Sequence, residues 1–279
     1  MDVVPSASDP KELFVYMVNH RVPLNGDAKD VGADSVIEIF KTTLSSGKLT
    51  HLKTVEHPAI VTPNDVTGFP DGKSFYFTND HYDKVSWLRE YRSFLFPGAS
   101  VGYCHVDEGC KFVSKNMLSN NGIAHAPNGT IYVASTLGKA LRVFEPQGDN
   151  SIILTDVIPC GEVSSNPFVN SLIQYWSVEA PLDNLAVDSD GVVWAAGFPN
   201  GHAMSIHMRN SSLRSPSGAW KIGINTGSNS FSGEKFTVEK VFEDNGEIAS
   251  GSTSVVHDAQ RGLVFFHGIV APWLTVCKE

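Results

Sequence analysis

Side chains that carry oxygen ligands recur at the head of short apolar segments in this sequence. Asn64-Asp65, Asn121 and Asp183-Asn184 each stand just before a run of alternating apolar residues. Carboxylate and amide oxygens suit Ca²⁺, which takes about six to eight oxygen ligands, whereas zinc prefers the nitrogen and sulfur of His and Cys. Together these side chains could bind calcium. Taken singly, each Asn or Asp near a glycine is more simply a turn former.

The three heads lie in segments that align with one another, 63–79, 120–136 and 182–198. Each has a polar head, an apolar run, a turn that ends in glycine and a second apolar run. The heads recur at intervals of 57 to 63 residues. That interval fits one four-stranded blade of a β-propeller, whose first strand lines the central channel. We therefore expect the polar heads to converge at the channel.

The rest of the chain predicts the same all-β class. Short apolar runs with turn residues between them follow at intervals of about ten residues. A fourth copy covers 248–268, with Gly-Ser-Thr at 251–253 in the place of the polar head, and a weaker one at 13–57 lacks the head. Helical periodicity is limited to 83–96 and 168–176. We expect one domain over residues 1–279, with about five blades and the first incomplete on its N-terminal side.

Composition excludes several functions. The net charge of −9 leaves no basic footprint for nucleic acid, so no such partner is expected. The longest apolar stretch, 262–276, is too short to cross a bilayer and contains His267 and Pro272. The first twelve residues show no signal peptide, and the compartment stays open. Two sequons, at Asn128 and Asn210, predict glycosylation only if the protein is secreted.

The cysteines do not form a recognisable pattern. The chain contains four, at positions 104, 110, 160 and 277, without the spacing of a zinc site. Four cysteines in a chain of this length do not make a disulfide scaffold. The residues by themselves predict free or incidental thiols.

At the level of motifs, the chain resembles the paraoxonase family of calcium-dependent arylesterases and lactonases. The motifs that carry the resemblance are "VNH" at 18–20, "PNDV" at 63–66, "FYFTNDHY" at 75–82, "NNGI" at 120–123, "LDNLAVD" at 182–188, "FPNG" at 198–201, "GST" at 251–253 and the terminal "VCKE". They occur in the family's order over essentially the whole chain, and "FYFTNDHY" is the most specific. A gluconolactonase-type propeller is another possible assignment. The motif "FYFTNDHY" and the terminal "VCKE" argue against it.

The resemblance implies a six-bladed propeller with two calcium ions. A catalytic calcium would be held by Asn64, Asn121, Asp183 and Asn184, and a buried structural calcium would use Asp65. The catalytic ion would polarise the carbonyl of an aryl ester or lactone and stabilise the oxyanion. The implied function is calcium-dependent hydrolysis of small esters or lactones.

The resemblance also implies roles for residues around that ion. His20 matches the second histidine of the family's dyad and could help to deprotonate the attacking water. Asp183 is an alternative base or nucleophile. Asp80 and His81 would line the pocket, although a purely structural role for His81 is equally open. Phe198 stands where animal paraoxonases tend to have histidine, which predicts a more apolar pocket.

Features that the family carries upstream are not in this sequence. They are a Glu-Asp pair that supplies one ligand to each calcium, a His-Gly motif with the first dyad histidine, the disulfide partner of Cys277 and a signal or anchor segment. The expectation is therefore a family member without the N-terminal part of the domain. The alternative function is an inactive remnant or an interaction scaffold. The insertion at 21–35 could cover the site or be a surface loop, and we favour the loop.

Overall fold

The computed structural model describes residues 1–85, 97–160 and 181–279. The helix expected at 168–176 and most of the one expected at 83–96 lie outside these residues. The chain divides into two compact units. The first consists of residues 1–125 and 146–153, and the second of residues 126–145 and 154–279. We describe each unit by itself.

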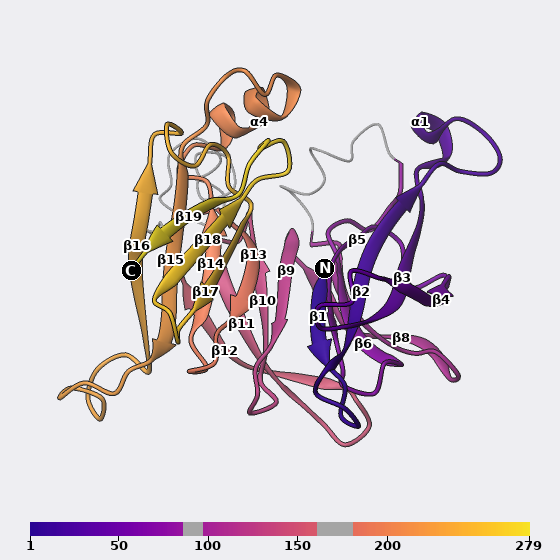
Figure 1. The fold of residues 1–279 in the computed structure, drawn as a ribbon, viewed down its shortest axis with the longest axis horizontal. Helices are drawn as coiled ribbons and strands as arrows, with labels where there is room; N and C mark the ends of the chain where they lie inside the picture. Colours follow the sequence, from indigo (N-terminus) through magenta and orange to yellow (C-terminus); the bar gives the residue numbers. More distant parts are fainter. Residues whose placement is uncertain (86–96, 161–180) are drawn as a thin grey trace. The chain divides into compact units, whose positions relative to one another are not determined.

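The first unit opens with a four-stranded antiparallel sheet in the order β1-β2-β3-β4 (Figure 1). Its strands are β1 (Asp2–Pro5), β2 (Glu12–Arg21), β3 (Asp34–Thr43) and β4 (Thr50–Val55). The sequence pattern did not reveal β1, because four residues that end in proline carry no strand signal of their own. They become a strand by pairing with β2, where Asp2 lies opposite Tyr16. The first sheet therefore has four strands.

The second sheet of this unit has the order β5-β6-β7-β8. Its strands are β5 (Pro63–Gly68), β6 (Ser74–Asn79), β7 (Ala99–His105) and β8 (Gly109–Met117), and β9 (Asn120–His125) follows. The aromatic rings of Tyr16, Phe75 and Phe77 pack in one buried cluster with aliphatic side chains of β2 to β5. Gly68 is required there, because a Cβ atom would lie 2.0 Å from the Tyr16 ring. A short helix, α1 (Ala28–Val31), interrupts the connection between β2 and β3.

The second unit contains the remaining strands. They are β10 (Ile131–Ser135), β11 (Ala140–Pro146), β12 (Ile152–Pro159), β13 (Leu182–Val187), β14 (Val193–Gly197), β15 (Ser217–Ile224), β16 (Phe236–Asp244), β17 (Ser254–Asp258), β18 (Leu263–His267) and β19 (Thr275–Lys278). Two sheets have the orders β13-β14-β15-β16 and β17-β18-β19. The boundary between the units passes through the sheet of order β12-β11-β10-β9. A nine-residue helix, α4 (Gly201–Arg209), follows β14.

The sequence repeats coincide with pairs of strands. The copies at 63–79, 120–136 and 182–198 are β5–β6, β9–β10 and β13–β14, and the fourth contains β17–β18. The glycine of each of the first three turns has a positive φ, which glycine adopts without steric cost. The described strands form five small antiparallel sheets, the blade-like units of a β-propeller. This confirms the predicted all-β propeller class.

The cysteine prediction was wrong for one pair. Cys104 and Cys110 form a disulfide, with their Cα atoms 4.0 Å apart. They lie directly opposite each other in the β7–β8 pairing. The hairpin turn between these strands brings the two positions face to face, which spacing along the chain did not indicate. In the described residues Cys160 and Cys277 are free.

Candidate functional site

The predicted ligand pair Asn64-Asp65 lies in an irregularity of β5. Pro63 is opposite Asn79 and Val66 is opposite Phe77, so β5 has one residue more than β6 between these points. A regular strand would direct two consecutive side chains to opposite faces of the sheet. A β-bulge breaks this alternation and re-aims the side chains, as often occurs next to functional sites.

Asp183-Asn184 lies in the equivalent irregularity of β13. Leu182 is opposite Gly197 and Leu185 is opposite Ala195, so β13 again has one extra residue. Two repeats therefore share a bulge at the same place, and both bulges hold one carboxylate and one amide. The sequence predicted the residues but not the bulges.

Within the first unit, the side chain of Thr78 on β6 links two of the polar heads. Its hydroxyl accepts a hydrogen bond from the backbone N–H of Asp65 (3.1 Å) and donates one to the backbone carbonyl of Asn121 (2.7 Å). Thr78 is fully buried. Sequence reasoning missed this residue, although it stands inside "FYFTNDHY", the most specific motif.

Asp65 is a buried carboxylate that is matched by positive charge. Its side chain is 7% exposed, and Oδ1 lies 2.8 Å from the amino group of Met1. Its Oδ2 accepts a hydrogen bond from the backbone N–H of Ile123 on β9 (3.0 Å). A buried carboxylate needs such compensation. A buried carboxylate oxygen is a donor of the kind that Ca²⁺ takes, so the chemistry of Asp65 fits a calcium ligand.

The asparagines of the first unit differ in their surroundings. Asn64 is half-buried, and its side chain makes no hydrogen bond to the residues that the structure describes. In the second copy, Asn120 directly precedes the predicted ligand Asn121. Asn120 is buried, and its side chain donates to the backbone carbonyl of Ser100 (3.1 Å). Asn120 therefore supports the fold, whereas Asn64 has its amide oxygen available for a ligand.

In the second unit, Asn184 is fixed by the head of the fourth copy. Its backbone N–H and its side-chain Nδ2 both donate to the carbonyl of Thr253, at 3.1 and 2.8 Å. With Nδ2 engaged, Oδ1 is the atom of this amide that could bind a cation. Asp183, beside it in the bulge, is 9% exposed. In the first unit Thr78 links two polar heads, and in the second Asn184 bonds the head of the fourth copy directly, whereas convergence of all heads at one channel stays a prediction.

The five predicted ligands fall into two groups. Asn64, Asp65 and Asn121 belong to the first unit, and Asp183 and Asn184 to the second. The described residues contain no cluster of three or more His, Cys, Asp or Glu side chains that could hold a metal ion. A metal would therefore depend on amide oxygens in addition to the carboxylate of each bulge.

His20, the predicted base, lies at the end of β2 with an exposed side chain. Its Nδ1 lies 2.9 Å from the hydroxyl of Ser35, which is directly opposite it on β3 and is buried. Next along the strands, Arg21 faces Asp34, and its Nη2 lies 2.5 Å from Asp34 and 3.2 Å from Glu56.

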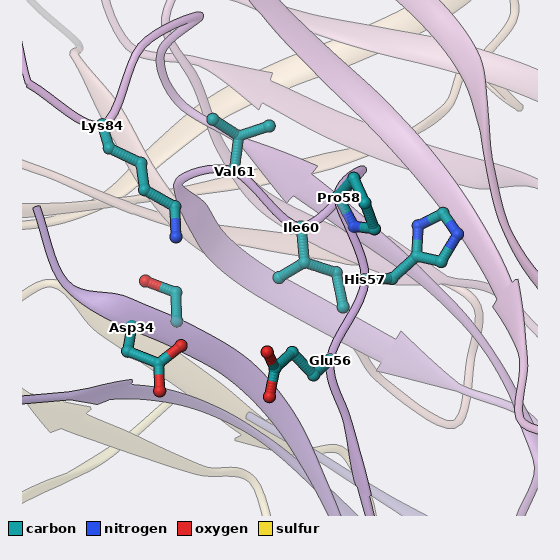
Figure 2. Close-up of a pocket in the computed structure, with 8 residues that line it drawn as sticks. Asp34, Glu56, His57, Pro58, Ile60, Val61 and Lys84 are labelled. Carbon is teal, nitrogen blue, oxygen red and sulfur yellow. The ribbon is translucent and has the colours of Figure 1, made fainter. Parts of the chain in front are cut away.

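A cavity of about 360 Å³ opens beside this pair of strands (Figure 2). It is lined by Asp34, Ser35, Glu56, His57, Pro58, Ile60, Val61 and Lys84. In Figure 2 the carboxylates of Asp34 and Glu56 and the amino group of Lys84 point into the same space, with Ile60 behind them. Lys84 reaches it past Gly32, where a Cβ atom would lie 2.6 Å from that of Lys84. The cavity therefore combines an apolar side with a charged rim.

Within the insertion at 21–35, Arg21 ends β2 and Asp34 and Ser35 begin β3, and residues 22–33 form a loop with one helical turn, α1. Its apolar residues Val22 and Leu24 are 85% and 91% exposed, so it buries little of its own surface. It lines a second, shallower pocket of about 230 Å³, which shares Asp34, Glu56 and Lys84 with the first.

The residues predicted to line a substrate pocket lie in different units. Asp80 and His81 follow β6, with Oδ2 and Nε2 3.7 Å apart. Thr62 holds this segment, because its hydroxyl donates to the His81 carbonyl and accepts from the His81 N–H, at 2.9 and 3.0 Å. Phe198 follows β14 in the second unit and is half-buried. The Thr62 contacts give the His81 backbone a structural role.

A further polar cluster in the second unit was not predicted. His257 lies between two carboxylates, with Nδ1 2.8 Å from Asp188 and Nε2 3.0 Å from Glu279. Its ring stacks on Trp194, whose Nε1 donates to Asp188 (2.9 Å). His257 and Asp188 are almost fully buried, at 5% and 2% side-chain exposure. The cluster joins β17 to the β13–β14 hairpin and acts as a structural clamp.

Comparison with known proteins gives consistent relatives. A sequence model of the arylesterase family matches residues 12–271. Human serum paraoxonase/arylesterase 2 is 28% identical over 244 residues, which cover 86% of this chain and 58% of the relative. Human serum paraoxonase/arylesterase 1 is 27% identical with the same coverage, and the chicken paraoxonase/arylesterase 2 is 28% identical over 92% of this chain and 64% of its own length. The chain thus spans less than two thirds of these relatives.

Solved structures with a similar fold include two bacterial proteins. A structure from Bacteroides uniformis assigned to the 6-phosphogluconolactonases has a TM-score of 0.53 at 11% identity, and the match covers 99% of this chain and 80% of that one. The periplasmic gluconolactonase of Pseudomonas aeruginosa has a TM-score of 0.52 at 11% identity, with 98% and 64% coverage. At this identity the likeness shows the fold alone. In the described residues, no helix is both long and apolar enough to span a bilayer.

Proposed function

Because the chain belongs to the arylesterase family, we propose that it hydrolyses aryl esters, lactones or both with the help of calcium. The observation that carries this proposal is the pair of equivalent β-bulges, each of which presents one carboxylate and one amide. Oxygen ligands of this kind are those that Ca²⁺ takes. The relatives named serum paraoxonase/arylesterase support the same class of reaction.

The proposed ligands of the catalytic calcium are Asn64, Asn121, Asp183 and Asn184, and Asp65 would hold a second, structural ion. When bound, calcium would polarise the ester carbonyl and stabilise the charge that develops on its oxygen. The free amide oxygen of Asn64, the oriented amide of Asn184 and the cation-paired carboxylate of Asp65 support this assignment.

His20 is the proposed general base. A neutral imidazole has its pKa close to physiological pH, so it can take a proton from water and release it again in each turnover. Asp183 is the competing candidate for this role. H20Q and D183N separate the two roles when kcat and calcium binding are measured together. Loss of the base His20 should abolish the pH dependence of kcat and leave calcium binding unchanged, whereas D183N should also weaken calcium binding, because Asp183 is a proposed ligand.

We place the apolar part of the substrate in the cavity beside Ser35, whose lining includes none of the proposed calcium ligands, so this placement is independent of the ligand assignment. The cavity volume of about 360 Å³ lies within the range of small-molecule sites, and its apolar side formed by Pro58, Ile60 and Val61 suits an aryl or alkyl group. The charged rim would face the ester group or solvent.

Chelation gives the direct test. Hydrolysis of phenyl acetate and of δ-valerolactone is measured with calcium, after EDTA, and after calcium is restored. We expect EDTA to abolish turnover, and N121A and D183A to lower kcat/KM by about 100-fold or more. The control is N128A, which changes an exposed turn residue of the same repeat as Asn121. Turnover that survives chelation would refute the calcium mechanism.

Calorimetry of calcium binding then examines the ligand assignment. If Asn121 and Asp183 hold one ion, N121A and D183A should each remove the same binding event. If the folded chain binds calcium but hydrolyses neither substrate, the result favours the alternative function, an inactive propeller or interaction scaffold.

A further inference from the structure

The His20 imidazole has a buried hydroxyl as its hydrogen-bonding partner across the β2–β3 pair. Building on the proposed function, we propose that Ser35 is a positioning residue that fixes the orientation of the His20 ring for proton transfer. The two residues are direct partners in the antiparallel register, and Nδ1 lies 2.9 Å from the Ser35 hydroxyl.

Ser35 is a firm anchor for this purpose. It is 5% exposed and lies on β3, where it pairs with β2, whereas the His20 side chain is exposed at the end of β2. In the tautomer in which Nδ1–H donates to the Ser35 hydroxyl, Nε2 carries no proton in the neutral ring, and we assign proton transfer to that nitrogen.

The charged groups near the pair do not replace Ser35. Arg21 and Asp34 are adjacent to the pair in register and bind each other, and Arg21 also binds Glu56. His57 and Lys84 are the remaining titratable groups around the adjoining cavity. In many hydrolases a carboxylate orients the catalytic histidine. Here Asp34 and Glu56 bind Arg21, and we assign the orienting role to the Ser35 hydroxyl.

Ser35 also lines the cavity of Figure 2. The same hydroxyl therefore connects the proposed base to the space in which we place the substrate. The lining of that cavity includes Ser35 but not His20, so a group bound there would contact the pair through Ser35.

The kinetic test compares H20Q, S35A, S35T and the double variant H20Q/S35A with the unchanged chain in calcium. We expect S35A to lower kcat by about 10-fold with little change in KM, since loss of an orienting partner of this kind costs about 10- to 100-fold. S35T keeps the hydroxyl and should restore most of the rate. The double variant should be no slower than H20Q, because Ser35 acts through His20.

A second readout does not depend on turnover. The imidazole resonances of His20 are titrated by NMR without calcium, in the unchanged chain and in S35A and S35T. We expect S35A to shift the midpoint of the His20 titration and to let the ring adopt more orientations. S35T should give the same titration as the unchanged chain. This readout remains valid if the chain turns out not to be a hydrolase. Failure of the Ser35 proposal can therefore be distinguished from failure of the proposed function.

The control variant is S6A, which removes another buried serine hydroxyl of the same unit, one that hydrogen-bonds to Ser8. It should change neither kcat nor the His20 titration. The inference is overturned if S35A changes neither the pH profile of kcat nor the His20 titration. It is also overturned if adding S35A to H20Q lowers kcat as much as S35A does in the unchanged chain. Covalent labelling of Ser35 by a fluorophosphonate would also overturn it, because Ser35 would then attack the substrate itself.

Discussion

Two buried aspartates show how this protein holds charge. Asp65 is compensated by an ammonium group and a backbone N–H, and Asp188 by His257, Trp194 and backbone amides. Burial by itself would raise the pKa of Asp188, but the hydrogen bonds from His257, Trp194 and the backbone more than offset it, so the pKa lies below its ordinary value. The ionised form of Asp188 is therefore part of the folded state.

The first prediction concerns D188N. A carboxylate whose pKa is lower in the folded than in the unfolded state stabilises the fold above its unfolded pKa, and this contribution is lost as the pH falls through the folded value. Loss of one partner of such a buried pair costs about 3 kcal/mol. We expect D188N to lower the free energy of unfolding by about this amount at pH 7, measured by urea denaturation.

The difference between D188N and the unchanged chain should shrink as the pH falls below about 4, the ordinary value for aspartate. The control is D107N, which removes an exposed carboxylate paired with Lys73 and should scarcely change the urea midpoint. A D188N effect that stays constant from pH 7 to pH 3 would contradict the assigned role of the charge.

At the scale of the elements, the β5 bulge and β9 are joined through Thr78. Its hydroxyl bonds both Asp65 and Asn121, and a methyl group in its place would leave a buried N–H and a buried carbonyl without that partner. The position of two proposed calcium ligands therefore depends on one hydroxyl group that contacts no substrate.

The second prediction follows from this contact. T78V should destabilise the fold by about 2 kcal/mol and weaken calcium binding by about 10- to 100-fold, as measured by denaturation and calorimetry, whereas T78S should retain both. The matched control is T67V on the neighbouring strand β5, which removes the hydrogen bond from the buried Thr67 hydroxyl to Asp2. T67V should cost stability but leave calcium affinity unchanged. Equal calcium affinity in T78V and T78S would count against the role of Thr78.

The Cys104–Cys110 disulfide also acts at the scale of the elements. It links β7 to β8 across a hairpin and joins two residues that are six positions apart in the sequence. Restriction of the unfolded chain by so short a loop is worth about 2 kcal/mol in the chain-entropy account. The third prediction is that a reducing agent, or the C104S/C110S double variant, lowers Tm by several degrees.

Cys104 and Cys110 are also distinguishable from the other two cysteines by their reactivity. Burial raises the pKa of the Cys160 thiol to about 12, so it should react slowly with alkylating reagents in the folded protein.

Equal Tm values under oxidising and reducing conditions would show that the disulfide does not contribute to stability.

For the whole molecule, the proposed calcium should act as a stabilising ligand. Anything that binds only the folded state stabilises it by mass action, by about 2.7 kcal/mol at one hundred times Kd. The fourth prediction is that saturating calcium raises Tm relative to EDTA and that magnesium at the same concentration does so far less. N121A should abolish the rise. A calcium-independent Tm would refute the metal site irrespective of activity.

Much of the fold could be predicted from the sequence. The repeats at 63–79, 120–136 and 182–198 became the strand pairs β5–β6, β9–β10 and β13–β14, because alternation and turn glycines are local signals. The strand β1 could not be predicted in this way, since its residues form a strand only by pairing with β2. The Cys104–Cys110 disulfide was missed for a similar reason, because it depends on the register of a hairpin.

The sequence by itself determined the all-β class, the repeat and the residue types at each polar head. Residue type and spacing are enough for these, because each is set within a few neighbouring residues. The tertiary structure alone decided that the Asn64-Asp65 and Asp183-Asn184 pairs lie in equivalent bulges, that Thr78 joins Asp65 to Asn121, and that Ser35 faces His20. These relations depend on strand register and on contacts between residues far apart in the chain, which no local pattern encodes.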